Sequence, residues 1–139
     1  VVIAYVTLGA DDISLAEMFY AAFLPRLGYT LEVSSDGLSC TIPRAIDHQY
    51  ESVDLYVKRP YDKQTASTGN GTMVAFRVST QALVRELHAA ALSNGGRNEG
   101  SPGFRAEYSA HFYVGYLRDP QGNKIALFCS AGDEPERPS

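Results

Sequence analysis

The sequence predicts an α+β domain in which two tandem βαβββ modules form a curved, cup-shaped mixed β-sheet with helices on its outer face. The first observation is an internal repeat, since residues 5–28 align without a gap on residues 73–96. Each copy joins an alternating strand to an amphipathic helix and ends on a glycine. The second observation is two turn signals downstream of the helices, at residues 34–37 and 119–123. A repeat of this kind fixes an architecture before any single element is assigned.

The first module begins with a strand over residues 1–8, where β-branched residues alternate. Asp11, Asp12 or Ser14 is placed to cap the following helix, and Gly28 to end it. The predicted apolar stripe of this helix is Leu15, Met18, Phe19 and Ala22.

A hairpin follows, with strands at 29–33 and 38–42 around an Asp-Gly turn. Residues 43–51 are predicted to form a loop, and residues 52–58 the last strand of the module.

The second module repeats this order with a strand at 72–78 and a helix capped by Ser79 or Thr80. Residues 97–110 are weakly patterned and are predicted to hold at most a short strand. Residues 112–117 and 124–128 form a hairpin around a turn with proline at its second position. The predicted apolar stripe of the helix is Leu83, Leu87 and Ala90.

Residues 1–130 are therefore predicted to be a single domain, which fits a chain of 139 residues. Module one extends to about residue 60, residues 61–71 form a linker, and module two covers residues 72–130. The tail, residues 131–139, carries two prolines and three acidic residues and is predicted to be disordered.

Composition excludes several kinds of partner. The net charge of −4 gives no broad basic field, so we expect no nucleic acid partner. No apolar run approaches the length of a membrane span, so we expect no membrane partner. The two cysteines, Cys40 and Cys129, lack a metal-like or redox-like spacing and are predicted to be free thiols in a reducing, cytoplasmic compartment.

The strand faces that point away from the helices are predicted to line the cup, because the regularly apolar faces should lie beneath the helices. Mixed aromatic and polar side chains suit a partly hydrated pocket, although a plain solvated sheet face is the alternative. The residues on these faces are Tyr5, Thr7, Ser39, Thr41, Asp54, Tyr56, Lys58, Met73, Ala75, Arg77, Lys124, Ala126 and Phe128.

Three segments of the duplicated pattern resemble the vicinal oxygen chelate superfamily, the glyoxalase, bleomycin resistance protein and extradiol dioxygenase group. They are residues 6–9 leading to Phe19 and Tyr20, residues 69–76, and residues 116–125 with their Asp-Pro-Gln-Gly-Asn turn. The resemblance covers residues 3–128 and implies a small-molecule cup. It also implies a homodimer, because relatives often pair so that modules from two chains complete each cup.

The resemblance also implies where a metal would bind, since metal-dependent members place His, Gln or Glu ligands on four cup-facing strands. These positions fall on Tyr5, on Asp54 or Tyr56, on Met73 and on Ala126. A thioether is a poor ligand for such cations and alanine is none, so we expect no metal and no other cofactor. The alternative left open is a different metal site made by His111, Asp54 and Glu107.

Without a metal, the candidate acid–base residues are His111 and Asp54, with His111 able to titrate near neutrality as a base. An inert histidine at a strand end is the alternative. The candidate ligand-binding residues are of three kinds. They are aromatic residues that could contact a flat ligand, cations that could bind a carboxylate or phosphate, and other residues that face the cup. They are Tyr5, Thr7, Tyr56, Met73, Arg77, Tyr108, Lys124, Ala126 and Phe128. The alternative is that Tyr5, Tyr56 and Phe128 fill the core and that Arg77 and Lys124 are solvated charges at strand ends.

Two functions remain open at this point. The first is a metal-free protein that binds a small organic molecule in the cup, as the resemblance to resistance proteins implies. The second is a glyoxalase-like lyase or isomerase that uses a divalent metal or a substituted acid–base residue. A third possibility, a dimerising domain without catalysis, is compatible with the same resemblance.

Overall fold

The structure is a computed structural model that describes residues 2–43 and 52–139. Module one contains β1 (Tyr5–Gly9), α1 (Ile13–Ala21), the 3₁₀ helix η1 (Leu24–Leu27), β2 (Thr30–Val33), β3 (Gly37–Thr41) and β4 (Asp54–Lys58). Module two contains β5 (Met73–Arg77), α2 (Gln81–Leu92), β6 (Arg97–Phe104), β7 (Tyr113–Arg118) and β8 (Lys124–Cys129). The predicted loop at 43–51 lies almost entirely outside the described residues. Neither described helix is long and apolar enough to cross a lipid bilayer.

The two modules have the same topology, which confirms the tandem βαβββ prediction. Their sheets have the strand orders β1-β4-β3-β2 and β5-β8-β7-β6. In each, the first strand pairs parallel with the last and the other pairs are antiparallel. Even the register repeats, because Tyr5 pairs with Asp54 as Met73 pairs with Lys124.

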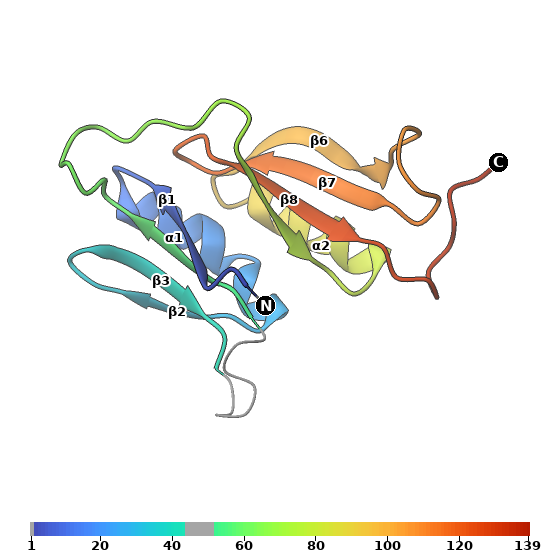
Figure 1. Cartoon of the computed structure of the whole chain (residues 1–139), viewed down its shortest axis with the longest axis horizontal. Helices are drawn as coiled ribbons and strands as arrows, with labels where there is room; N and C mark the ends of the chain where they lie inside the picture. The colour runs from blue at the N-terminus through green and yellow to red at the C-terminus, as the bar shows by residue number, and fades with distance from the viewer. Residues whose placement is uncertain (1, 44–51) are drawn as a thin grey trace.

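The sheets lie side by side and each carries its own helix on one face (Figure 1). Helix α1 contacts β3 and β4, and α2 contacts β6, β7 and β8. The predicted cup-shaped sheet is thus divided into two four-stranded sheets that do not close on each other. The faces opposite the helices are left open.

A single apolar core runs beneath both helices. Phe19, Phe23 and Leu24 have no exposed surface, nor have Leu117 and Leu127 of module two. Burying a side chain of this size stabilises a fold by about 1.5–3 kcal/mol. Ring contacts across the module boundary make the core continuous, since the ring of Phe76 lies 5.9 Å from Phe23 and 6.0 Å from Tyr29.

The predicted helix stripes are rotated relative to the observed ones. Leu15 and Met18 are 44% and 45% exposed, and α1 instead buries Ile13, Ala16, Phe19 and Tyr20. Helix α2 buries the predicted Leu87 with Val84 and Ala91, which were expected to flank the stripe, whereas Leu83 and Ala90 are only partly buried. Each helix has two adjacent rows of mostly apolar residues. The buried row includes one polar residue, Tyr20 in α1 and His88 in α2, which makes a hydrogen bond in the interior.

Strand β6 corrects the prediction for residues 97–110, because it is eight residues long and the longest strand described. Its register against β7 shifts between Asn98 and Gly100 and again before Gly103. Such bulges add unpaired residues and break the alternation of side chains, so a regular strand pattern is missing from the sequence although the pairing is present.

Polar groups of the tail contact module two. The Glu134 carboxylate accepts a hydrogen bond from the backbone N–H of Gln81 at the start of α2. Arg137 donates to the carbonyl of Tyr108 at 2.9 Å, and its N–H donates to the carbonyl of Ala110 at 2.8 Å. Bonds of this kind, in which one partner is charged, are stronger than bonds between neutral groups.

A buried carboxylate joins the two modules. Asp119, in the turn between β7 and β8, is 1% exposed, and its Oδ1 accepts from the backbone N–H groups of residues 121–123. Its Oδ2 accepts from the Tyr20 hydroxyl at 2.6 Å and from Asn123 Nδ2 at 3.0 Å. Asn123 Nδ2 also donates to the carbonyl of Gly9 at 2.9 Å. We call Tyr20, Asp119 and Asn123 the module clasp.

The protonation of the clasp follows from its burial. Burial raises the pKa of Tyr20, and the neighbouring Asp119 raises it further. The phenol therefore stays protonated and donates to the carboxylate, which links α1 of module one to the last hairpin of module two.

Replacing the donor tests the clasp. Tyr20→Phe keeps the ring and is expected to lower the free energy of unfolding by about 1.5–3 kcal/mol, the usual contribution of a hydrogen bond to a charged group. Urea denaturation measures the change. Tyr61→Phe, at a fully exposed side chain, is the matched control and should change stability by less than about 0.5 kcal/mol. Equal stability of the two variants would contradict the role of the Tyr20 hydroxyl.

Candidate functional site

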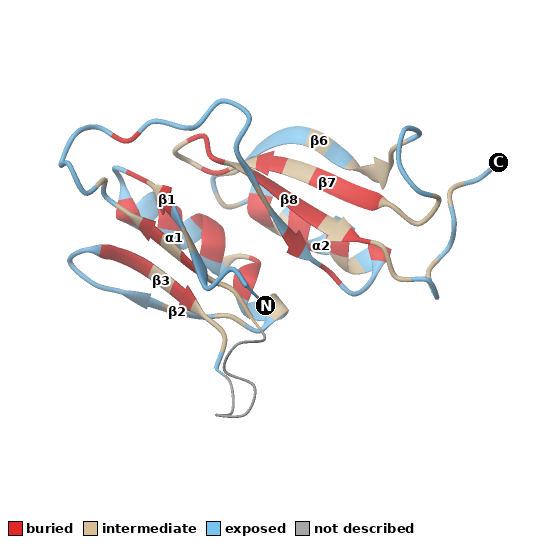
Figure 2. Ribbon diagram, viewed as in Figure 1, coloured by how far each residue is buried: buried red, intermediate tan, exposed pale blue. Residues whose placement is uncertain are grey.

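The open faces of the two sheets carry the predicted cup residues. Tyr5 and Met73 begin β1 and β5 and are 62% and 44% exposed, whereas their strand neighbours Leu8 and Phe76 are buried. Along each strand exposed residues alternate with less exposed ones, and Figure 2 shows that much of β1 and β5 is exposed or intermediate. The alternation confirms the predicted division into a core face and an open face.

Module one forms a groove of about 790 Å³ between the open face of its sheet and the linker. Tyr5 packs edge-on against Tyr56 with ring centroids 5.5 Å apart, and the ammonium of Lys58 lies 5.6 Å from the centre of the Tyr56 ring. The lining residues are Tyr5, Thr7, Gly9, Asp36, Lys58, Arg59, Pro60, Tyr61, Asp62, Thr65, Ala66 and Ser67.

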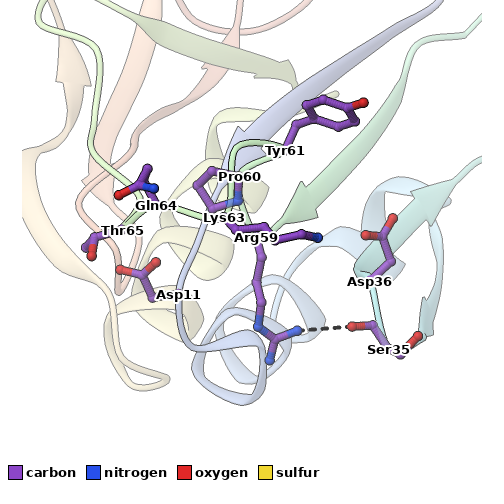
Figure 3. A pocket seen from close by; sticks show the side chains of 9 residues that line it. All are labelled: Asp11, Ser35, Asp36, Arg59, Pro60, Tyr61, Lys63, Gln64 and Thr65. Carbon is purple, nitrogen blue, oxygen red and sulfur yellow. Dashed lines mark hydrogen bonds between the residues drawn. The ribbon is translucent and has the colours of Figure 1, made fainter.

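A second groove of about 890 Å³ adjoins the first and shares several of its linker residues (Figure 3). Arg59 donates to the carbonyl of Ser35 at 3.1 Å and so ties the linker to the β2–β3 turn. Ala66 N–H donates to the Asp11 carboxylate at 2.8 Å and holds the other end. The segment predicted to be a mere connector is therefore a wall of both grooves.

The charge around these grooves is mixed. Lys58 and Asp36 form an ion pair at 2.9 Å, and the hydrogen bond and charge of Asp36 raise the pKa of Lys58. The same grooves are also lined by two carboxylates, Asp11 and Asp62, and by two cations, Arg59 and Lys63. The grooves therefore present aromatic surface and paired charges rather than a field of one sign.

Module two places Met73 and Lys124 in a separate pocket of about 490 Å³, together with Arg118 and the loop 68–72. The Lys124 ammonium lies 4.9 Å from the centre of the Tyr116 ring, and the Arg105 guanidinium lies 5.4 Å from the same centre. Ala126, beside this pocket in the sheet, is 1% exposed. Its register partners Ala75 and Tyr116 flank it on either side.

Asp54 lies at the seam between the modules. It lines an apolar pocket of about 260 Å³ with Ile3, Tyr29, Met73 and Ala75, among others. Asp54 is also the register partner of Tyr5. Asp54 and Met73 thus line one pocket at the seam, and Tyr5 is next to Asp54 in the sheet.

The remaining predicted residues gather at the far end of β8, about 13 Å along the strand from Lys124. The rings of Tyr108, Phe112 and Phe128 form a stack with centroids 4.6 and 4.9 Å apart. Arg77 lies over Phe128 and donates to Ser130 at 3.1 Å. These residues form a separate surface of module two.

His111 also lies at this end of module two, next to the tail. Its Nε2 is 3.9 Å from Glu136 Oε1, and its side chain is 28% exposed. His111 and Asp54 therefore belong to different modules and different surroundings, so the structure does not unite the two candidate acid–base residues in one pocket.

The four implied metal positions do not fit a divalent cation. Tyr5, Asp54, Met73 and Ala126 offer a phenol, a carboxylate, a thioether and a methyl group. Divalent ions in proteins need several oxygen, nitrogen or thiolate donors. Among residues 2–43 and 52–139, no three His, Cys, Asp or Glu side chains stand close enough to hold a metal, and this includes His111, Asp54 and Glu107.

Sequence reasoning missed residues 59–67, which include the first part of the linker, as part of the site. The available signal was the presence of Tyr61 and two cations in a segment otherwise made of small polar residues. An aromatic side chain in such a segment indicates that the segment lines a groove, as Tyr61 does here.

Comparison with known proteins places the fold. No family model matches the sequence, and no curated protein matches it. A solved glyoxalase/bleomycin resistance protein from Albidiferax ferrireducens has a TM-score of 0.79 at 28% identity, over 94% of this chain and 100% of that chain.

Two further structures share the fold at lower identity. A glyoxalase/bleomycin resistance protein/dioxygenase family enzyme from Burkholderia phytofirmans has a TM-score of 0.69 at 17% identity, covering 92% of this chain and 98% of that one. A lactoylglutathione lyase from Agrobacterium tumefaciens has a TM-score of 0.60 at 19% identity, covering 91% and 92%.

The cysteines can be tested as nucleophiles. Both are free and have no exposed surface, and burial raises the pKa of Cys40 to about 12. Because the thiolate is the reactive form, a thiol reagent at mildly alkaline pH is expected to leave the folded protein unlabelled and to label both cysteines in denaturant. Mass spectrometry counts the labels. Rapid labelling of the folded chain would contradict the assignment of both thiols to the core.

Proposed function

We propose that this chain, whose fold is that of the vicinal oxygen chelate superfamily, binds a small organic molecule against its open sheet faces without a metal. The ligand class is a flat or largely apolar compound that contacts the groove of module one. The proposal makes the protein a binding protein of the glyoxalase/bleomycin resistance type rather than a metalloenzyme.

The observation that carries the metal-free part is Ala126. It stands where the resemblance places a ligand glutamate, it has no donor atom, and it is 1% exposed between Tyr116 and Ala75. With Met73 at the equivalent of the Tyr5 position, two of four donors are absent by chemistry. The remaining carboxylate and phenol are too few to replace the water shell of a divalent ion.

The groove supports the binding part of the proposal. Its volume of about 790 Å³ falls in the range of small-molecule sites, and the ring of Tyr5, which packs edge-on against Tyr56, lines it as an aromatic surface. The exposed ring of Tyr5 gains a contact surface when a flat ligand displaces water from it. Thr7 and Lys58 beside the rings supply polar groups that orient the ligand.

A glyoxalase-like lyase or isomerase is the second candidate. The similarity in fold to the lactoylglutathione lyase from Agrobacterium tumefaciens favours it. Such an activity here would need a base other than the missing glutamate, and Asp54 at the seam or His111 near the tail would have to supply it. Fold alone is a weak reason to assign a reaction, so this candidate ranks second.

Binding of a planar aromatic probe tests the first candidate. EDTA-treated protein is expected to bind 2-naphthol, measured by the fluorescence of the probe, and Tyr5→Ala is expected to weaken binding about tenfold through the loss of ring contact. Leu15→Ala removes an exposed apolar side chain from α1, on the helix-covered side, and should leave binding unchanged.

Added metal separates the two candidates. Nickel or zinc should not change the affinity for 2-naphthol or start isomerisation of a methylglyoxal hemithioacetal. Turnover that depends on the metal, or a bound metal found by elemental analysis, would favour the lyase or isomerase over the metal-free binding protein. Absence of probe binding to the wild-type protein would remove the binding proposal.

We also propose that two copies of the chain pair along the seam. Val2, Ile3, Tyr5 and Met73 are large apolar residues that remain exposed there, which is costly for an isolated chain. Sedimentation at micromolar concentration is expected to show a dimer, and Tyr5→Asp should shift it toward monomer. A wild-type protein that sediments as a monomer would contradict the pairing.

A further inference from the structure

Three cations form a row across the open face of module two. Arg97 of β6 pairs in register with Arg118 of β7, Arg118 pairs with Lys124 of β8, and Lys124 pairs with Met73 of β5. Residues directly opposite each other in neighbouring strands point to the same face of a sheet. The next residues along β7 and β8, Leu117 and Ile125, are fully buried, so the basic row lies on the open face.

Such a row is unfavourable for the isolated sheet, because like charges directly opposite each other repel. One carboxylate compensates part of it, since Glu99 Oε1 lies 3.2 Å from the Arg118 guanidinium. The pKa of the Glu99 carboxyl is lowered chiefly by its hydrogen bond with Arg118, and Lys124 and Arg97 also contribute. The group of three cations and Glu99 therefore keeps a net charge of +2.

The cations border a pocket that is open enough for a small anion. Arg118 and Lys124 line the hollow of about 490 Å³ together with the loop 68–72. The Arg97 guanidinium lies beside the loop 68–72, because both it and Thr68 are close to Gly122. A Cβ atom added to Gly122 would lie 3.4 Å from the Thr68 methyl group and 3.8 Å from the Arg97 guanidinium.

The loop supplies further donors for an anion. It contains two threonine hydroxyls and is closed by a hydrogen bond from Thr72 N–H to the Gly69 carbonyl at 3.2 Å. Gly71 has φ 90°, a conformation that glycine adopts without strain and that leaves the backbone uncovered.

We propose that Arg97, Arg118 and Lys124, with the loop 68–72, bind the phosphate group of a phosphate monoester. A phosphate monoester carries a charge of about −1.5 to −2 at neutral pH, which matches the surplus of the row. Arginine presents paired donors to such an oxyanion and lysine a single concentrated charge. Lys124 is the best placed to respond, since within the described part of the chain it has a cation–π contact with Tyr116 but no ion pair.

Module one shows that the row is particular to module two and is no requirement of the fold. The pairs equivalent to Arg97–Arg118 and Met73–Lys124 are Thr30–Thr41 and Tyr5–Asp54. The same four strands thus carry neutral and acidic side chains at these places. Three cations at the matching positions of one module indicate a ligand of opposite charge.

The phosphate site rests on the proposed function in one respect, namely that the phosphate is a group of the same small molecule that binds in the groove of module one. Inorganic phosphate tests the basic row by itself, and 2-naphthol tests the groove by itself. Binding of 2-naphthyl phosphate more tightly than either would show that one ligand uses both. Failure of one site is therefore visible while the other still binds.

Calorimetric titration of the wild-type chain with inorganic phosphate is expected to show binding that weakens with added salt, and acetate, a monoanion, should bind more weakly. Lys124→Gln should weaken phosphate binding about tenfold, the effect of losing one charged hydrogen bond. Glu99→Gln should strengthen it several-fold, because the competing carboxylate is removed. Arg26→Gln, which removes a cation from the helix-covered side, should have no effect.

Thermal unfolding provides a second readout, measured first without phosphate and then with it. Lys124→Gln relieves repulsion in the row, so its melting temperature without phosphate should equal or exceed that of the wild type, and phosphate should stabilise the wild type more than the variant. The proposal is overturned if the wild type fails to bind phosphate, if Lys124→Gln and Arg26→Gln bind it equally, or if Glu99→Gln binds it more weakly.

Discussion

The arrangement of the molecule depends on the buried carboxylate of Asp119. Among the described strands none of one sheet pairs with a strand of the other, so side chains must fix how one sheet is set against the other. Asp119 does this with polar partners from both modules, the Tyr20 hydroxyl of α1 and the Asn123 amide that also reaches the Gly9 carbonyl. Every donor around the carboxylate is directional, so the clasp sets orientation as well as proximity.

The same turn determines the position of the groove walls. Gln121 accepts from the backbone N–H of Asp11 at 2.9 Å and donates to the carbonyl of Ala66 at 3.2 Å. The linker is therefore anchored to the clasp hairpin and to the start of α1 at once. An element of module two thus holds the wall of a groove in module one, which explains how a segment without a core of its own has a defined course.

The fold follows from the sequence because the repeat is a global signal. Strand, helix and glycine recur at one fixed offset, and the Asp-Pro turn closes the last hairpin where predicted. Strand β6 was not predicted at its full length, because its pairing with β7 is bulged and a bulged strand has no regular alternation in its sequence. For the site, alternation predicted the open faces, but periodicity says nothing about a linker or about which residues share a row across four strands.

Ala126 has a consequence for how this protein can change. Its methyl group fills a closed space between Ala75 and Tyr116, and the Tyr116 ring is itself flanked by the cations of Lys124 and Arg105. A longer acidic side chain at residue 126 would have to push neighbouring side chains aside, because almost none of the Ala126 surface is exposed. The single substitution Ala126→Glu is therefore expected to lower stability by about 1–3 kcal/mol before it could offer a donor atom on the open face.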